Sequence, residues 1–256
     1  AGKWGYITSC GNEYISTASI NTIVLQTGYY DDFTFDFGWT VNGNATAGVW
    51  ERGEPQGTSY LGNEFNPDED VSGDCTDFAY VTGNDGGSAG NDDVDDGNTV
   101  LTSPIFDATN NSVNYVEYYK WFAVGGGNGG VSADELTISI TNGTTTALLE
   151  TITLISPNLN IWTHSTIDIA QHITPTATMQ LIIETADIPM GNLVEAAFDK
   201  FSIINAPSAI SEESKLEKGK LIDIVDVLGR SVKNTANSPV FYRYENGVVE
   251  KRIIIE

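Results

Sequence analysis

The stretch Glu135-Leu-Thr-Ile-Ser-Ile140 alternates polar and apolar residues with a period of two, which is the pattern of a half-buried β-strand. Similar strand-like runs follow one another along the chain, separated by Gly, Asn or Pro and without a helical period. These runs are Phe33–Phe37, Phe78–Val81, Val113–Phe122, Leu148–Leu154, Trp162–Ile169, Met179–Glu184 and Glu195–Ile204. The chain is therefore predicted to be all-β, with an antiparallel β-sandwich or jelly roll as its main domain.

Turn-forming residues are abundant, with 26 Gly and 8 Pro in the 256 residues. Asn42-Gly43-Asn44 lies between the short apolar pairs Thr40-Val41 and Val49-Trp50, and predicts a β-hairpin that joins them. The hydrophobic fraction of 40% is large enough to build a core, so the chain is not globally disordered.

The charge balance excludes several classes of partner. Only 12 basic residues face 35 acidic ones, which gives a net charge of −23. A protein that binds nucleic acid through its phosphates needs clustered Lys and Arg, and so does a polybasic membrane anchor. No apolar run approaches the roughly 18 residues that a transmembrane helix needs. We therefore expect no nucleic-acid partner and no transmembrane segment.

The charge is also unevenly distributed, which predicts a division of the chain. Residues 1–210 hold four basic and 27 acidic residues, whereas the remaining residues hold eight of each. The segment around Ala206-Pro-Ser-Ala209 is small and polar, as linkers are. We predict the end of one β domain at 1–28, a jelly-roll module at 29–206, a linker at 207–219, and a small β-sandwich at 220–256.

Four motifs in the predicted jelly roll occur in a recognisable order. They are Tyr80-Val-Thr-Gly-Asn84, Asn91-Asp-Asp-Val-Asp-Asp-Gly97, Thr99-Val-Leu-Thr-Ser-Pro-Ile-Phe-Asp107 and Leu193-Val-Glu-Ala-Ala-Phe-Asp-Lys-Phe-Ser202. This arrangement resembles the MAM-like jelly-roll modules of secreted bacterial proteins, whose carriers include serine and zinc peptidases. The resemblance implies a non-catalytic accessory module in a secreted or surface-attached protein.

The N-terminal residues carry a shorter resemblance. Gly2-Lys-Trp-Gly-Tyr-Ile7 and Ile20-Asn-Thr-Ile-Val-Leu25 resemble the last two strands of a carboxypeptidase-regulatory-like repeat. This implies that any catalytic domain, such as a peptidase, would lie upstream of this sequence. Cys10 and Cys75 are the two cysteines, and in a secreted chain they are candidates for a disulfide. The alternative is a pair of free thiols.

The C-terminal residues resemble a type A sorting signal of the Bacteroidetes type IX secretion system. Leu221-Ile-Asp-Ile-Val-Asp-Val-Leu-Gly-Arg230 is followed by a segment with Asn246-Gly247 and a basic residue before a final Ile-rich strand. The residues that carry the resemblance are Leu228, Gly229, Arg230, Gly247 and Lys251. The implied partners are the outer-membrane translocon and its β-barrel shuttle, and the implied location is the cell exterior. The alternative is simply a last β domain.

A Ca²⁺ site is predicted from an excess of carboxylates. Between Arg52 and Lys120 there are fourteen acidic residues and no basic one. Such carboxylates repel one another unless they are solvated or bridged by a cation, and Ca²⁺ prefers six to eight oxygen ligands. The tight turn Asp92-Asp-Val-Asp-Asp-Gly97 supplies four carboxylates, of which Asp92, Asp93 and Asp95 are the predicted ligands. The jelly-roll resemblance adds Asp199 and Asp31 or Asp32, with Asp32 preferred. The alternative is a solvated acidic loop.

Patterns that suggest catalysis are incomplete. Gly86-Gly-Ser-Ala-Gly90 matches the nucleophile elbow in letters but lacks its strand and helix context. Trp162–Ile169 would place His164 and Asp168 on one strand face, without a further metal ligand nearby. Glu184 and Glu195 can be imagined as a glycosidase pair. We predict no catalytic residue in this chain.

Two rival functions stay open beside the secreted accessory module. Trp39, Trp50, Trp121 and Trp162 could form a sugar-stacking platform, although Trp more often fills a sandwich core. A carbohydrate-binding or surface-adhesion module is therefore one alternative. A small β-sandwich hydrolase or lyase is the other.

Overall fold

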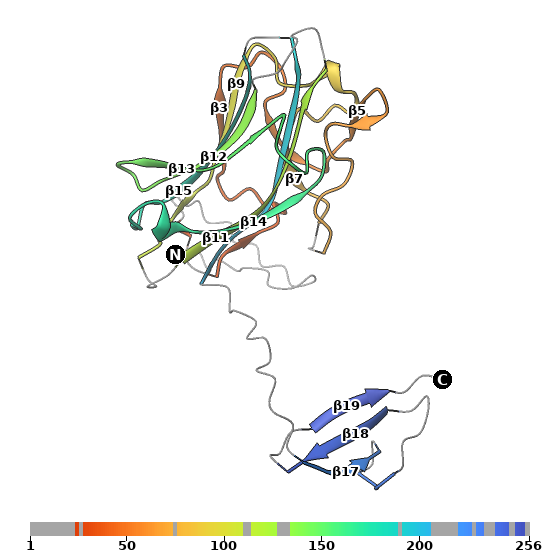
Figure 1. The fold of residues 1–256 in the computed structure, drawn as a ribbon. Coiled ribbons are helices and arrows are strands. Elements are labelled where there is room, and N and C mark those ends of the chain that lie inside the picture. Colours follow the sequence, from red (N-terminus) through yellow and green to blue (C-terminus); the bar gives the residue numbers. More distant parts are fainter. Residues whose placement is uncertain are drawn as a thin grey trace. The chain divides into compact units, whose positions relative to one another are not determined.

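A computed structural model describes residues 24–25, 28–73, 76–109, 114–126, 134–188, 191–205, 220–226, 229–232, 239–245 and 249–253. The chain divides into two compact units, Ala1–Pro207 and Ser208–Glu256 (Figure 1). Across the ranges given above, no helix has the length and apolar character needed to cross a bilayer. The predicted disulfide partners Cys10 and Cys75 lie outside these ranges, as does the Gly2–Ile7 segment.

One face of the first unit is a six-stranded sheet with the order β14-β11-β16-β7-β4, in which β2 also pairs with β16. All its strand pairs are antiparallel. The strands are β2 (Tyr30–Asp31), β4 (Trp50–Gly53), β7 (Ala79–Thr82), β11 (Asn114–Gly125), β14 (Thr163–Asp168) and β16 (Leu193–Asn205).

The opposite face is a five-stranded antiparallel sheet with the order β13-β12-β15-β9-β3. Its strands are β3 (Thr40–Gly43), β9 (Gly97–Thr102), β12 (Glu135–Thr141), β13 (Thr146–Thr153) and β15 (Gln180–Asp187). Smaller elements complete the unit. They are β1 (Val24–Leu25), β5 (Thr58–Tyr60), β6 (Asn63–Glu64), β8 (Gly87–Ser88), β10 (Ile105–Phe106) and the 3-10 helices η1 (Ala89–Asn91) and η2 (Ile169–Gln171).

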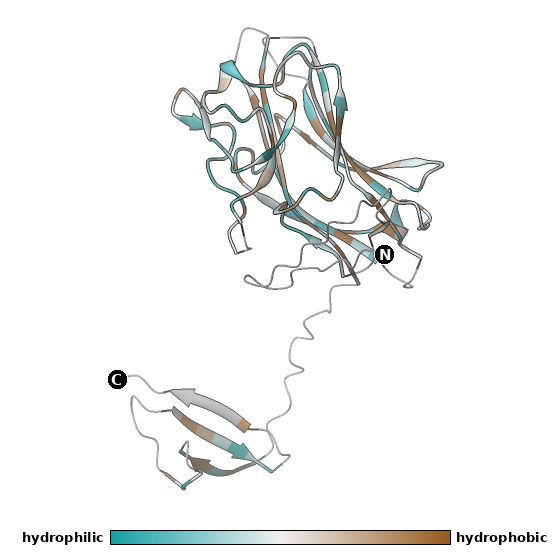
Figure 2. Cartoon of the chain, turned by 180° about the vertical axis from the view of Figure 1, so that it is seen from behind, coloured by the Kyte–Doolittle hydropathy of each residue, from teal (hydrophilic) through white to brown (hydrophobic). Residues whose placement is uncertain are grey.

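The core lies between the two sheets and follows from the alternation of their strands. Leu136, Ile138 and Ile140 of β12 are fully buried, whereas the residues between them are half-buried on the other side of the strand. Figure 2 shows apolar residues concentrated along the long strands. Phe33 and Trp39 add an aromatic cluster with ring centroids 5.3 Å apart. The all-β, antiparallel sandwich predicted from the sequence is therefore confirmed.

Two local predictions are wrong. Phe33–Phe37 is not a strand, because side chains compete for its backbone amides: Asp31 accepts a hydrogen bond from the Phe33 amide at 3.0 Å, and Asp36 accepts one from Gly38 at 2.8 Å. Phe33 takes φ of 56° and enters the core. The predicted hairpin at Asn42–Asn44 does not form either. β3 pairs with β9 and β4 pairs with β7, so the two strands belong to opposite sheets.

A β-bulge interrupts β16 where it pairs with β11. Glu117 pairs with Ser202 and Tyr119 with Asp199, so β16 contains one more residue than its partner between these pairs. Lys200 has φ of 51°, which is the left-handed conformation of a bulge residue. Asp199 and Ser202, three residues apart, therefore lie on the same outer face of the sheet.

The second unit contains an antiparallel sheet of β17 (Leu221–Val225), β18 (Pro239–Tyr244) and β19 (Val249–Ile253). Val240, Tyr242 and Tyr244 form its small core.

The residues of the predicted sorting signal are distributed around this sheet. Gly229 and Arg230 lie in the turn after β17, where the Arg230 guanidinium pairs with Asp226 at 2.7 Å. Lys251 lies in β19 opposite Phe241. Leu228 and Gly247 lie outside the described residues.

Candidate functional site

The outer face of the six-stranded sheet presents side chains from three adjacent strands, β14, β11 and β16. Alternation and the bulge place a defined set of residues there. This set is Tyr115, Glu117, Tyr119, Trp121, Ala123, His164, Thr166, Asp168, Glu195, Ala197, Asp199 and Ser202. The segment 57–73 crosses part of this face. The face therefore has a covered part and an open part.

The covering segment is fastened by hydrogen bonds to the sheet. The Trp121 indole donates to the Phe65 carbonyl at 2.5 Å, and the Val71 amide donates to Asp199 at 3.0 Å. Trp121 is thereby buried with Ala197 in a small apolar cluster outside the main core. Trp39 and Trp50 belong to the main core, as the commoner role of Trp predicts.

The open part centres on an aromatic pair. The rings of Tyr119 and His164 lie on paired strands with centroids 4.7 Å apart and an interplanar angle of 31°. His164 Nε2 lies 2.7 Å from Glu117 Oε1, and these side chains are 40% and 30% exposed. Lys200 Nζ lies 5.8 Å from the Tyr119 ring centroid. We call Glu117, Tyr119, His164 and Lys200 the open patch.

The open patch combines flat rings with hydrogen-bonding groups, and further polar groups surround it. Ser202 donates to Glu117 at 3.4 Å, and Thr166 donates to the other oxygen of Glu117 at 3.5 Å. As the sequence predicted, His164 and Asp168 share one strand face. Asp168 instead caps η2 by accepting from the Ala170 amide at 3.0 Å, so it does not contact His164 as a catalytic partner.

Two hollows on this unit differ in their lining from the open patch. One, of about 560 Å³, is lined by acids that include Glu54, Asp68 and Asp77. The other, of about 470 Å³, lies beside Thr137 and Glu184 on the second sheet. Neither lining contains an aromatic ring. Neither hollow therefore offers a stacking surface like that of Tyr119 and His164.

The covered part ends in a buried carboxylate cluster. Glu195 is fully buried, and its Oε2 accepts a hydrogen bond from the Thr58 hydroxyl. The Thr58 hydroxyl in turn accepts a hydrogen bond from the backbone amide of Asn66 at 2.9 Å. Asp92 and Asp93 approach from the acidic turn. We call Thr58, Asn66, Asp92, Asp93 and Glu195 the covered cluster.

Burial and mutual repulsion raise the pKa values in this cluster. Loss of solvent is the main cause that raises the pKa of Glu195 to about 8, and the nearby Asp93 and Asp92 raise it further. Burial, followed by the charge of Asp95, raises the pKa of Asp93 to about 7. Carboxyl groups with such pKa values stay protonated near neutral pH unless a bound cation replaces the protons.

The five aspartates predicted as Ca²⁺ ligands do not meet in one place. Asp93 lies beside Val194, because the following amide, that of Val94, donates to the Val194 carbonyl at 3.0 Å. Asp199 lies five residues further along β16, which is roughly 16 Å away at the rise of a strand. Asp32 accepts from the Thr34 amide at 3.3 Å and follows Asp31, which pairs with Phe201, so it lies toward the Asp199 end of β16 and away from the acidic turn.

Only the turn residues Asp92, Asp93 and Asp95 are grouped as the sequence predicted. Within the described ranges, no three side chains of His, Cys, Asp or Glu are arranged to hold a metal ion by themselves. Any cation site in this region therefore needs amide or carbonyl oxygens among its ligands. Ca²⁺ binding stays a prediction.

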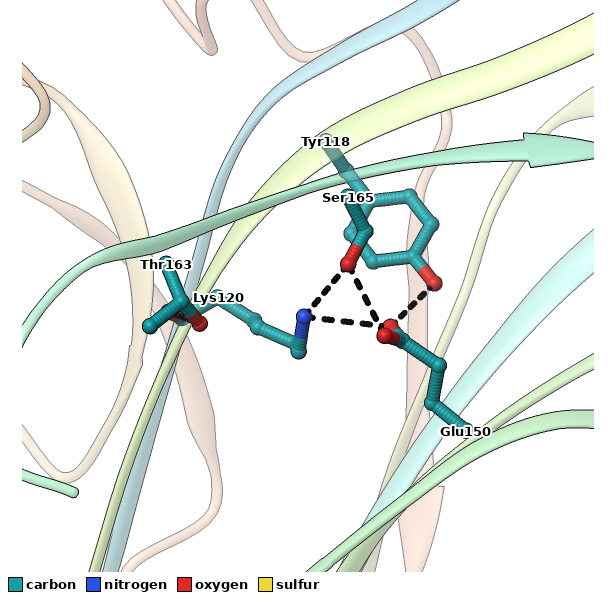
Figure 3. Close-up of polar contacts among 5 residues, drawn as sticks. All are labelled: Tyr118, Lys120, Glu150, Thr163 and Ser165. Carbon is teal, nitrogen blue, oxygen red and sulfur yellow. Dashed lines mark hydrogen bonds and ion pairs between the residues drawn. The ribbon is translucent and has the colours of Figure 1, made fainter. Parts of the chain in front are cut away.

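A buried polar network joins the two sheets at their β13 and β14 edges (Figure 3). Lys120 Nζ donates to Ser165 at 2.5 Å and lies 3.2 Å from Glu150. The Glu150 carboxylate accepts two hydrogen bonds, one from the Ser165 hydroxyl at 2.9 Å and one from the Tyr118 hydroxyl at 2.7 Å. Burial raises the pKa of Tyr118, which keeps it a donor. Lys120 and Ser165 are buried between the sheets, and the network is a structural link between β11, β13 and β14.

The imagined glycosidase pair is not assembled. Glu184 lies on the outer side of the five-stranded sheet, where Asn98 donates to it at 2.7 Å. Glu195 lies on the outer side of the six-stranded sheet. The two carboxylates therefore lie on opposite sides of the sandwich and cannot flank one bond.

Comparisons with known proteins find only distant similarities. No protein-family model matches the sequence, and no curated protein matches it. The K1 cleaved adhesin domain of the Lys-gingipain of Porphyromonas gingivalis W83 is 14% identical, covers 70% of this chain and 98% of that one, and has a TM-score of 0.42.

Two carbohydrate-binding modules are similarly distant. TmCBM61, solved with β-1,4-galactotriose, is 12% identical over 66% of this chain and 90% of that one, with a TM-score of 0.39. The family 11 module of the cellulase Lic26A-Cel5E of Clostridium thermocellum is 13% identical over 74% and 97%, with a TM-score of 0.38. The strand order and the core define the first unit by themselves as an antiparallel β-sandwich of the jelly-roll class.

Proposed function

We propose that the first unit is a non-catalytic carbohydrate-binding or adhesion module that acts outside the cell, and that the open patch is its contact surface. The observation that supports this most directly is the Tyr119–His164 pair, which lies on an accessible sheet face with Glu117 and Lys200 at its border. A sugar ring offers an apolar face for stacking and hydroxyl groups for hydrogen bonds. The open patch supplies rings for the stacking and charged side chains for the hydrogen bonds.

The other sheet gives a useful contrast. The strands β3, β9, β12, β13 and β15 contain no aromatic residue at all. Their outer face offers hydroxyl, carboxylate and aliphatic groups without a ring on which a sugar can stack. The open patch is therefore the better candidate for a glycan.

Glycan binding is tested with the full chain on an array of immobilised oligosaccharides and polysaccharides, followed by calorimetry with the strongest hit. We expect Tyr119→Ala and His164→Ala each to raise the dissociation constant at least tenfold, or about 1.4 kcal/mol. Ile182→Ala, on the other sheet, is the matched control and should bind as the wild type does. Absence of binding on the array, or equal binding by all variants, would contradict the proposal.

We also propose that residues 220–256 direct export through a type IX secretion system, with the translocon and its β-barrel shuttle as partners. The motif around Leu228-Gly229-Arg230 and the basic residue Lys251 support this. The compact second unit, which has its own core of Val240, Tyr242 and Tyr244, is compatible with a transferable signal. Fusion of residues 211–256 to a neutral reporter should send it out of a secretion-competent Bacteroidetes cell. Retention of the reporter in the periplasm would overturn the proposal.

A further inference from the structure

Two buried oxygen atoms in the covered cluster have no hydrogen-bond partner. They are Glu195 Oε1 and Asn66 Oδ1, and their residues are 0% and 1% exposed. A buried polar atom without a partner costs on the order of 1–3 kcal/mol, so native proteins rarely leave one unsatisfied. Two such atoms in one cluster point to a missing ligand.

The hydrogen bonds identify which end of each side chain is left without a partner. The Asn66 side-chain nitrogen donates to the carbonyls of Thr82 at 2.6 Å and Gly83 at 3.0 Å, which uses both of its hydrogens. The Asn66 amide group therefore cannot be reversed, and Oδ1 is its free end. The Thr58 hydroxyl accepts a hydrogen bond from the Asn66 backbone amide and donates one to Glu195 Oε2. Glu195 Oε1 is then the carboxylate oxygen without a partner.

The residues that carry these two oxygens are linked to each other and to the acidic turn. The Asn66 backbone amide lies against the Glu195 carboxylate, and the Asn66 side chain lies against Gly83. Gly83 has φ of 59°, and a Cβ there would overlap Asp92. The charge of Asp92 acts in turn on Glu195. The two free oxygens therefore belong to neighbouring residues of one cluster.

No basic side chain among the described residues of the first unit is available to neutralise this site. Arg52 donates to the Phe33 carbonyl at 2.7 Å, Lys120 contacts Ser165, and Lys200 donates to the Ser72 carbonyl at 2.6 Å. Buried carboxylates need either protons or a cation. The acidic turn thus adds negative charge where the protein supplies no positive charge.

We propose that Glu195 Oε1 and Asn66 Oδ1 are ligands of a Ca²⁺-class divalent cation in the covered cluster, with Asp92 and Asp93 supplying further negative charge. One amide oxygen, up to three carboxylates and backbone carbonyls match the all-oxygen preference of Ca²⁺. This site differs from the predicted one in two respects. It excludes Asp32 and Asp199, and it includes an amide oxygen. It does not depend on glycan binding.

A cation here would link three parts of the chain. Asn66 belongs to the covering segment, Asp92 and Asp93 belong to the turn before β9, and Glu195 belongs to the last strand of the sheet. The ion would fasten the covering segment to the sheet at this end. The alternative is a neutral Glu195, whose own hydrogen occupies Oε1 and removes the need for an ion.

The test is calorimetry of the full chain with CaCl₂ after removal of metal by chelation, with MgCl₂ as a competitor. We expect a Ca²⁺ site in the wild type whose affinity falls at least tenfold in Glu195→Gln and in Asn66→Ala. Glu184→Gln, which removes a carboxylate from the opposite side of the sandwich, should bind as the wild type does. No Ca²⁺ binding by the wild type, or equal affinity in Glu195→Gln, would overturn the proposal.

A second measurement needs no change in the cluster itself. Tb³⁺ bound at this site should be sensitised by Trp121, whose indole donates to the carbonyl of Phe65, the residue before Asn66. We expect Trp121→Phe to lower the sensitised emission several-fold while Ca²⁺ affinity stays within twofold of the wild type. Trp39→Phe, in the main core, is the control. Undiminished emission from Trp121→Phe would place the ion elsewhere and overturn the proposal.

Discussion

Glu195 carries an unusual combination of properties for a residue on the outer face of a sheet. It is fully buried, one of its oxygens accepts from Thr58, and the charged groups that act on it, Asp92 and Asp93, are both acidic. The fold therefore holds this carboxyl group in an environment that opposes its ionisation. This has a direct consequence for the pH dependence of stability.

Without a divalent cation, the free energy of unfolding should fall as pH rises from about 4.5 to about 8. The pKa of Glu195 is about 8 in the folded chain and 4.5 in its ordinary state. The folded state therefore keeps a proton that the unfolded state releases, and the associated stability is complete below pH 4.5 and lost by pH 8. For Glu195 alone the loss is on the order of 4 kcal/mol.

Urea unfolding in chelator at pH 5 and pH 8 measures this effect. Asp93, whose pKa rises to about 7, contributes in the same direction. Glu195→Gln isolates the Glu195 contribution, because it should flatten most of the dependence. A wild-type chain that becomes more stable between pH 5 and pH 8 in chelator would contradict the prediction.

Gly83 is the second residue for which a single substitution is informative. Its φ of 59° strains any side chain, and a Cβ would also overlap the backbone oxygen of Asp92. Gly62 has φ of 81° with no atom within 4 Å of the added Cβ, so it is the matched control. Gly83→Ala should cost roughly 1–3 kcal/mol more than Gly62→Ala in urea unfolding. Equal losses would show that Asp92 does not pack against this position.

At the scale of the elements, the strands on both sheets were predictable where alternation is strong. The runs at Glu135–Ile140, Trp162–Ile169 and Met179–Glu184 correspond to β12, β14 and β15. Phe33–Phe37 alternates equally well but is not a strand. Aspartates that bond amides two residues ahead compete with sheet pairing, and this competition is not visible in a pattern of apolar residues.

The open patch was predictable only in part. Strand alternation correctly placed His164 and Asp168 on one face. The pairing of β14 with β11, which brings Tyr119 to His164, is a long-range contact that no local pattern encodes. Asn66 was missed entirely, since a lone Asn between Phe65 and Pro67 has no motif around it.

The polar network between the two sheets permits a test at the level of elements. Lys120 and Glu150 come from β11 and β13, so their ion pair links one sheet to the other. Lys120→Met or Glu150→Gln leaves the other charge without its partner, and each should cost about 3 kcal/mol. The double variant should cost clearly less than the sum of the two. Additive losses, measured by urea unfolding, would show that the pair is not coupled.

At the scale of the whole molecule, the distribution of charge follows the two compact units. The acidic residues that make the net charge −23 lie before residue 210, and the division into units falls between Pro207 and Ser208. The first unit carries the open patch and the covered cluster, and the second carries the proposed export signal. Binding and delivery would thus be separate properties of one chain.

This separation predicts that export can be removed without loss of binding. A chain with Ile224→Asp, which places a charge against the small core of the second unit, should fail to leave the cell. The same protein, purified from the cell, should bind the glycan identified on the array with unchanged affinity. A loss of affinity greater than threefold would contradict the separation.

The central claim, that the open patch binds a glycan, can be tested directly through the two histidines of the chain. His164 lies in the open patch, whereas His172 follows η2 and is exposed to solvent outside it. Titration of the full chain with the bound oligosaccharide, followed by NMR of the imidazole ring signals, should shift His164 in a saturable way and leave His172 unchanged. A saturating ligand that leaves His164 unmoved would contradict the account.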